Sequence, residues 1–159
     1  MMKKLLLFLF GATLLLNLSC SRDDDSSDFS GSVVGSWYLY SIGLNGTVTK
    51  NGISSPINTT QVLNSCMQKS TVILNQDGTG NATSWEDTSG TCTQVQDDKL
   101  TYTYDASTKV LNVKTGTKID VTSLTKLSNT EMVGEENVTN FAVEGATFTG
   151  KITTTMKRK

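Results

Sequence analysis

The residues best suited to chemistry in this 159-residue chain are three cysteines and some adjacent acids, because the sequence contains no histidine. Without histidine, Ser-His-Asp triads, Cys-His dyads and imidazole metal sites are excluded. Neighbouring residues on a strand point to opposite faces, so adjacent acids are not natural acid/base pairs, and no Asp/Asn spacing matches a calcium loop. We therefore expect a non-enzymatic protein with no metal and no cofactor. We interpret the acidic pairs as solvated loop charges; they are Glu86-Asp87, Asp97-Asp98 and Glu135-Glu136.

The first cysteine, Cys20, follows a segment with the features of a secretory signal peptide. Lys3 and Lys4 form a basic start, and residues 5–16 are an almost continuous apolar run. This run is too short for an ordinary transmembrane helix, which needs roughly 20 residues. We therefore assign residues 1–19 to a signal peptide.

The segment Asn17-Leu18-Ser19-Cys20 resembles a lipobox, the processing site of bacterial lipoproteins. The resemblance implies a diacylglycerol on the Cys20 thiol, cleavage before Cys20, and acylation of the new amine by a chain such as palmitate. Several acyl chains make a stable membrane anchor. Asn17 departs from the pattern, in which leucine is usual three residues before the cysteine. A plain secretory peptide with an incidental cysteine is the alternative.

Residues 20–30 are expected to form a flexible tether. The run at 21–28 is acidic and polar and has no apolar residue, which is typical of a solvated segment. It also resembles the acidic signal that sends some Gram-negative lipoproteins to the outer face of the outer membrane. We therefore expect a lipid-anchored outer-membrane protein, at the cell surface or otherwise on the periplasmic face. A plain linker is the alternative.

Two cysteines, Cys66 and Cys92, remain once Cys20 is lipidated. In an oxidising compartment they most simply form one disulfide. The loop between them is about 26 residues, which corresponds to roughly 3–4 kcal/mol of stabilisation in the chain-entropy model. Free thiols or a metal pair are the alternatives, although the sequence offers neither histidine nor CxxC spacing for a metal. A cysteine nucleophile would lack its usual base.

Strands must position these residues, because threonine, serine and glycine abound while helix formers are scarce. We predict a first strand over residues 34–44, a hairpin turn at Asn45-Gly46 and a short strand over 47–50. Residues 51–66 are predicted to be irregular, with a brief helical turn over 59–64.

The clearest predicted hairpin joins residues 70–76 to residues 81–86 through Asp77-Gly78-Thr79-Gly80. Further strands are predicted at 100–104, 110–114, 119–124 and 131–135, with a turn at Gly116. The last strand, from Ala146 on, alternates most cleanly, with Phe148, Ile152 and Met156 on one parity and mostly threonine and lysine on the other. Such alternation indicates one buried face and one solvated face.

About eight short antiparallel strands predict an all-β up-and-down meander that closes into a barrel, in one domain over residues 31–159. Closure would also remove exposed strand edges. A two-sheet β-sandwich is the alternative. An eight-stranded barrel can be filled by side chains or hold one small ligand, and the sequence does not choose between the two.

Gly35-Ser36-Trp37 resembles the Gly-x-Trp signature of lipocalins, in which the tryptophan closes the base of the barrel. The order of this motif, Asn64-Ser65-Cys66, residues 69–79, Cys92, residues 100–102 and residues 123–128 is similar to the lipocalin-like domain of secreted bacterial lipoproteins. The resemblance covers roughly residues 31–159 and implies an eight-stranded barrel and a cysteine pair. It implies no defined activity.

A basic residue of the last strand often covers the tryptophan in lipocalins. Arg158 shares the parity of Phe148 and Met156, so we expect it to point inward toward Trp37. That contact would be a cation–π cap of order 1 kcal/mol. A frayed basic tail, Lys157-Arg158-Lys159, is the alternative.

The pattern and the resemblance together predict a protein that carries a small apolar ligand or serves as an accessory of an envelope complex. A structural or protein-interaction subunit with a filled barrel is the alternative. The formal net charge of −1 gives no electrostatic reason to expect a nucleic-acid partner. Contact with a membrane is expected only through the anchor at Cys20.

Overall fold

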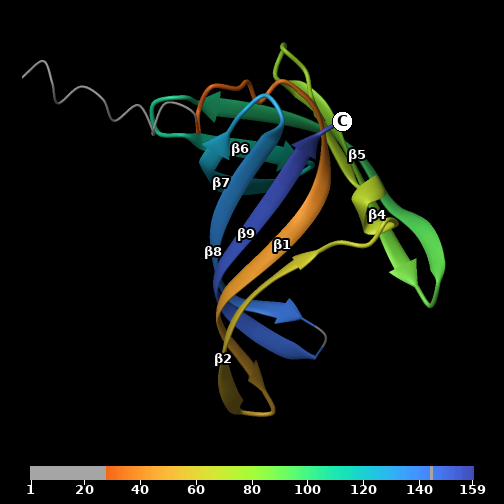
Figure 1. Cartoon of the computed structure of the whole chain (residues 1–159), viewed down its shortest axis with the longest axis vertical. Coiled ribbons are helices and arrows are strands. Elements are labelled where there is room, and N and C mark those ends of the chain that lie inside the picture. The colour runs from red at the N-terminus through yellow and green to blue at the C-terminus, as the bar shows by residue number, and fades with distance from the viewer. Residues whose placement is uncertain (1–27, 144) are drawn as a thin grey trace, which may run out of the picture.

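The computed structural model describes residues 28–143 and 145–159, so the predicted signal peptide, Cys20 and most of the predicted tether lie outside the described residues. The described chain is built almost entirely of antiparallel strands (Figure 1). One short 3-10 helix, η1 (Met67–Lys69), is its only helix, and nothing in this part of the chain forms a helix long and apolar enough to cross a membrane. The strands are β1 (Gly35–Lys50), β2 (Ile53–Val62), β3 (Thr71–Leu74), β4 (Thr79–Thr88), β5 (Thr91–Asp105), β6 (Val110–Thr115), β7 (Lys118–Leu127), β8 (Glu131–Val143) and β9 (Ala146–Arg158).

Eight of these strands close into a barrel. The start of β1 pairs with β3, and each later strand pairs with its neighbour in sequence as far as β9. β9 then pairs with β1 from Trp37↔Arg158 to Thr49↔Thr147, which closes the sheet. The predicted all-β antiparallel barrel is therefore confirmed, and the two-sheet sandwich is not formed. The ninth strand, β2, lies outside the closed ring and pairs with the second half of β1.

The first hairpin differs from the prediction. β1 runs without interruption through Asn45-Gly46, so the predicted turn there is wrong, and the chain reverses at Asn51-Gly52 instead. Both dipeptides tolerate the positive φ of a tight hairpin, and Asn51 and Gly52 adopt it, with φ of 53° and 77°. Pairing with β9 selects the second turn, because it requires extended backbone at Gly46, opposite Gly150.

The segment after this turn is also more regular than predicted. β2 pairs with β1 over its whole length, so the irregular chain predicted for residues 51–66 is wrong over 53–62, and so is the helical turn predicted at 59–64. Pro56 is compatible with β2 because the strand lies at a sheet edge, where a missing N–H leaves no ladder bond unmade. Threonine-rich sequence favours the strand once β1 offers it a partner.

The far ends of β8, β9, β1 and β2 project below the barrel as one sheet (Figure 1). β8 reaches Val143 and is therefore much longer than the predicted strand at 131–135. Gly46 and Gly150 are direct partners across β1 and β9, and a Cβ on Gly150 would stand 2.4 Å from the carbonyl oxygen of Asn45. The buried ring of Phe148 lies only 3.0 Å from the ideal Cβ position of either glycine. The glycine pair thus lets the strands approach closely and leaves room for the ring.

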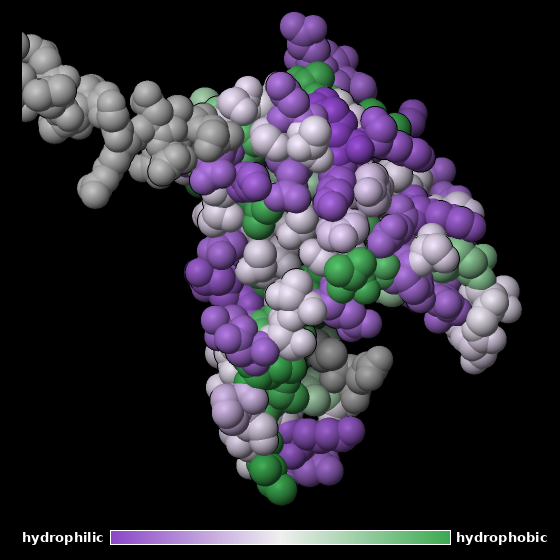
Figure 2. Space-filling model, viewed as in Figure 1, coloured by the Kyte–Doolittle hydropathy of each residue, from purple (hydrophilic) through white to green (hydrophobic). Residues whose placement is uncertain are grey.

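The projecting sheet also carries exposed apolar side chains. Ile53 is 72% exposed and Phe141 is 50% exposed. Figure 2 shows hydrophobic residues among the surface atoms of this lower projection, whereas much of the upper surface is hydrophilic.

The hydrophobic core fills the upper, closed end of the barrel. Trp37, Leu74 and Leu127 are almost completely buried. The same cluster continues through further residues of the barrel wall, namely Val33, Leu100, Leu111, Leu124 and Met132. The predicted inward parity of β9 is confirmed, because Phe148 is buried and Met156 packs against this core.

Residues 28–31 run alongside the end of β7. Phe29 forms a parallel bridge with Leu127, and the N–H of Gly31 donates to the Leu127 carbonyl at 3.0 Å. The ammonium of Lys109 lies 3.7 Å from the centroid of the Phe29 ring. The chain is therefore held against the barrel from Asp28 onward, before the boundary at residue 31 that the composition suggests.

Candidate functional site

A cavity of about 270 Å³ lies inside the barrel. Strands β3 to β9 line it with alternate residues, because alternate side chains of a strand point to the same face. Most of this lining is apolar, and the apolar members are Val72, Leu74, Ala82, Leu100, Leu111, Val113, Leu124, Met132, Ile152 and Met156.

The cavity is apolar at its floor and polar at its mouth. Leu74 and Leu100 are 1% and 4% exposed, so the floor is shielded from water. Gln96 and Glu136 are exposed and Asp120 is half-buried, and all three line the same cavity. A concave, mostly apolar pocket with a few polar groups is typical of a small-molecule site.

Negative charge exceeds positive charge among Lys118, Asp120 and Glu136 at the cavity mouth. The Lys118 ammonium lies 2.8 Å from the Asp120 carboxylate. The hydrogen bond to Asp120 raises the pKa of Lys118 above its usual value, and the charges of Asp120 and then Glu136 add to the effect. These three side chains together carry one net negative charge at neutral pH.

The volume limits what the cavity can hold. A dry cavity of roughly 150 Å³ lined by Leu, Ile and Phe is large enough for benzene. About 270 Å³ therefore suits a small apolar molecule, or the apolar part of a larger one whose polar end projects from the mouth.

The opposite end of the barrel is closed by Trp37 and Arg158, which the structure brings together. The indole N–H of Trp37 donates to the carbonyl of Val33 at 2.8 Å. The guanidinium carbon of Arg158 lies 4.3 Å from the Trp37 ring centroid. Its two terminal nitrogens donate to the carbonyls of Val34 at 3.0 Å and Ser32 at 2.9 Å. Arg158 therefore ties β9 to the segment that leads into β1.

Gly35 makes room for this contact. Its φ is 144°, and a Cβ at this position would stand 2.3 Å from Nη1 of Arg158. The three residues predicted to close the barrel, Gly35, Trp37 and Arg158, thus lie side by side at its closed end. β9 continues through Arg158 and does not end in a frayed tail before it.

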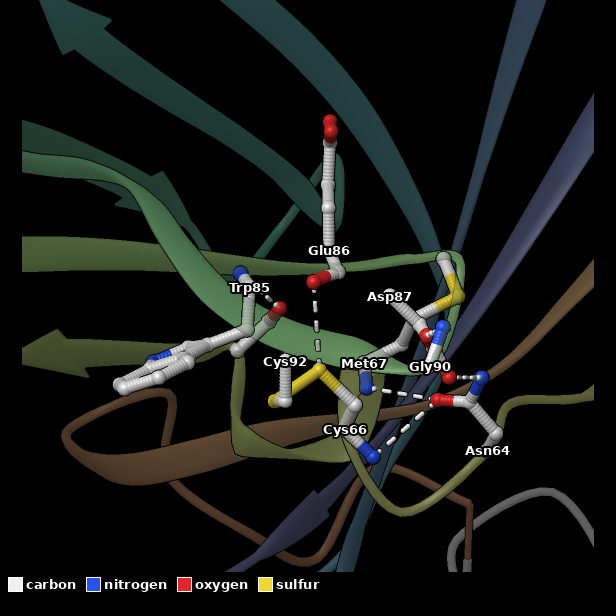
Figure 3. The surroundings of a disulfide bond; sticks show 9 residues. Asn64, Cys66, Met67, Trp85, Glu86, Asp87, Gly90 and Cys92 are labelled. Atoms are coloured by element: carbon white, nitrogen blue, oxygen red, sulfur yellow. Dashed lines mark hydrogen bonds between the residues drawn. A yellow bond between two sulfur atoms is a disulfide. The ribbon is translucent and has the colours of Figure 1, made fainter.

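The predicted disulfide between Cys66 and Cys92 is confirmed, with a Cα–Cα distance of 5.5 Å. It links the residue before η1 to the start of β5 (Figure 3). The Asn64 side chain supports this junction, because its oxygen accepts the backbone N–H groups of Cys66 at 3.1 Å and Met67 at 2.9 Å. The disulfide lies outside the barrel cavity and has no part in its lining.

The acidic pairs are more than solvated loop charges. Asp87 accepts a hydrogen bond from the amide of Asn64 at 3.2 Å, and Asp97 accepts one from Asn81 at 2.9 Å. Along the part of the chain that the structure describes, no group of three or more His, Cys, Asp or Glu side chains is placed to hold a metal ion.

The third pair divides between the two faces of β8. Glu135 forms an ion pair with Lys151 at 2.7 Å, whereas Glu136 lines the cavity mouth. Sequence reasoning missed the cavity residues Gln96, Asp120 and Glu136 altogether. Parity within each strand was the available signal for Asp120, which lies two residues from Thr122 and four from Leu124 on the inward face of β7.

Cys20 lies outside the described residues, so its lipidation stays a prediction. No curated protein matches this chain. The model of the lipocalin-like domain family matches residues 33–134. The matched region contains both disulfide cysteines and most of the cavity wall, while β9 follows it. Members of this family generally bind small ligands and are not enzymes. With this match and its closed eight-stranded barrel, the chain belongs to the lipocalin-like domain family.

Proposed function

We propose that this protein binds a small, largely apolar molecule inside the barrel without chemical conversion. The observation that carries the proposal is the cavity of about 270 Å³, with its leucine floor and polar mouth. Burial of apolar surface contributes about 25 cal/mol per Å², which makes such a floor the main source of affinity. Membership of a family that generally binds small ligands supports the same conclusion.

The charges at the cavity mouth limit the class of ligand that the cavity can bind. Asp120 and Glu136 present carboxylates there, and Lys118 pairs with Asp120. A carboxylate head group, as in a fatty acid, would be repelled by this excess of negative charge. The best match is an apolar body with a neutral or cationic end that donates hydrogen bonds, such as a hydroxyl or an amine.

The residues of the mouth also support binding without catalysis. The chain has no histidine, and of the two acids at the mouth one is engaged by Lys118. General acid/base catalysis requires a group poised to exchange a proton with the ligand. The proposal therefore gives the carboxylates at the mouth a role in binding and none in proton transfer.

We also propose that acyl chains on Cys20 hold the barrel at the outer membrane, on the cell surface or otherwise on its periplasmic side. The basic and apolar residues 1–19, Cys20 itself and the acidic run after it support this location. Radiolabelled palmitate should enter the wild-type protein but not Cys20→Ser. Digestion by proteinase K added to intact cells would place the barrel at the surface, whereas digestion only after lysis would place it inside.

Binding is tested with N-phenyl-1-naphthylamine, a neutral dye whose fluorescence rises in apolar surroundings. Ala82→Phe puts a ring into the cavity, whereas Ala142→Phe adds the same volume at an exposed position of β8. We expect Ala82→Phe to abolish dye binding and Ala142→Phe to leave it unchanged. Equal binding by all three proteins would show that the dye does not enter the barrel.

The natural ligand is sought by native mass spectrometry of the protein purified gently from its own cells. An added mass that disappears on organic extraction, and that is missing from Ala82→Phe, would establish a carried ligand. A bare mass together with no dye binding would instead favour the second candidate, a protein-interaction subunit. The exposed Ile53 and Phe141 on the projecting sheet are the observation that favours this candidate.

A further inference from the structure

A second concavity lies on the outside of the barrel, away from the cavity. It measures about 460 Å³ and is called here the Trp85 groove. Tyr38 of β1, Lys69 of η1, Trp85 of β4, Gln94 of β5 and Lys159 are the lining residues that matter for its chemistry. None of these residues lines the interior cavity, so the groove is a separate site.

The groove is built from interactions that hold its walls in place. The disulfide fixes η1, which lies against β4, to the start of β5 (Figure 3). The backbone N–H of Trp85 donates to the Ser70 hydroxyl at 2.9 Å. The hydroxyls of Thr71 and Thr83 bond to each other at 2.8 Å across the groove floor. Figure 3 shows the Trp85 ring pointing away from the sulfur atoms.

The chemistry of this groove is aromatic and cationic. The Lys69 ammonium lies 5.1 Å from the Trp85 ring centroid, and Lys159 also lines the groove. Among the described residues, those that line the groove include no Asp or Glu, although the chain as a whole has a net charge of −1. On the neighbouring strands, the ammonium of Lys157 stands 3.7 Å from the Tyr40 ring centroid. Local positive potential therefore surrounds rings that ligands can reach.

We propose that the Trp85 groove binds an acidic saccharide. The apolar C–H face of a pyranose ring can stack on the indole, with an adjacent carboxylate or sulfate beside Lys69 and hydroxyls beside Gln94. Two lysines in the lining are too few for a nucleic-acid strand, whose binding rests on neutralising many phosphates.

The test is isothermal titration calorimetry of the purified protein with oligogalacturonate and with chondroitin sulfate. Dextran is the neutral control, and poly-glutamate and a single-stranded oligonucleotide are the anionic controls. We expect both acidic saccharides to bind, more weakly at higher salt, and the three controls not to bind. Trp85→Leu and Lys69→Gln should each weaken binding about fivefold or more, the size expected for a stacking or cation contact of about 1 kcal/mol.

Lys50→Gln is the matched charge control, because Lys50 is exposed at the opposite end of β1 from Tyr38. It should bind the saccharides like the wild type. Unchanged dye binding in the barrel by Trp85→Leu and Lys69→Gln would show that these variants are folded. No saccharide binding, equal binding by dextran, poly-glutamate or the oligonucleotide, or full binding by both groove variants would overturn the proposal. Because the groove and the cavity share no lining residue, failure here leaves the dye result intact.

Discussion

The guanidinium of Arg158 lies over the indole of Trp37, with 4.3 Å between its central carbon and the ring centroid. The two residues are also direct register partners of β9 and β1, so one contact joins the last strand of the barrel to the first. Hydrogen bonds from Arg158 to the carbonyls of Ser32 and Val34 extend the junction to the chain before β1. The pair both covers the closed end and fixes the seam at which the sheet closes.

Arg158→Met should therefore destabilise the barrel. It removes two charge-assisted hydrogen bonds and the cation–π contact, and we expect the free energy of unfolding to fall by about 2 kcal/mol after allowance for partial exposure. Urea unfolding followed by tryptophan fluorescence measures the change. Arg158→Lys keeps the charge but not the fork geometry and should give an intermediate loss. A loss below about 0.5 kcal/mol for Arg158→Met, as for a neutral surface change, would contradict this role.

Gly150→Ala tests the close approach of β1 and β9. The new Cβ would stand 2.4 Å from the Asn45 carbonyl oxygen, and φ at this position is 155°. We expect a loss of about 2–4 kcal/mol from strain and displacement. Gly116→Ala is the matched control, because φ there is 59° and its Cβ would meet no atom within 4 Å; its cost should be about 1 kcal/mol. Equal losses in thermal unfolding would show that backbone angle alone, not crowding, sets the effect.

Loss of the disulfide should lower the stability of the protein without abolishing dye binding in the cavity. Cys66 and Cys92 are separated by 26 positions, and Cys66→Ala with Cys92→Ala should cost roughly 3–4 kcal/mol in the chain-entropy model. Thermal unfolding with and without dithiothreitol measures this, and reductant should have no effect on the double variant. Dye binding should persist below the lowered melting temperature, because neither cysteine lines the cavity. Loss of dye binding in the folded double variant would show that the disulfide shapes the barrel interior.

Asp105 should make stability depend on pH in the acid range. Hydrogen bonds from Ser107 and then Thr108 lower the pKa of Asp105 to about 2, from 3.8. Because the folded pKa is the lower one, the stabilisation is fully present above about pH 4 and is lost as the pH falls through about 2. Asp105→Asn keeps the oxygen acceptor but not the charge. Its stability should fall less than that of the wild type between pH 4 and pH 2, and parallel pH profiles would refute the assignment.

The local sequence pattern was sufficient to predict a turn or a buried face wherever a few consecutive residues determine that feature. The turn between β3 and β4 covers residues 75–78, two residues before the predicted one, and Gly116 lies in the turn between β6 and β7, as predicted. The alternation of Phe148, Ile152 and Met156 also identified the inward face of β9. These features depend on side-chain period and turn chemistry, both of which are written in a few consecutive residues.

The local sequence pattern gave a wrong prediction where pairing with a strand distant in the sequence determines the backbone conformation. Asn45-Gly46 is a stronger turn signal than most, yet it lies in the middle of β1. Gly46 is needed there as the partner of Gly150 beneath the Phe148 ring. The same competition turned the threonine-rich chain at 53–62 into β2, since β1 offers it an edge to pair with.

The sequence by itself determined the all-β class, the cysteine pair and the side of β9 that faces the core, because each depends on composition, count or period. Tertiary structure alone decided that the barrel contains a cavity and that Gln96, Asp120 and Glu136 all line it. These residues come from three strands and stand far apart in the chain. Their placement around one cavity depends on the register and closure of the whole sheet, and no local segment contains that information.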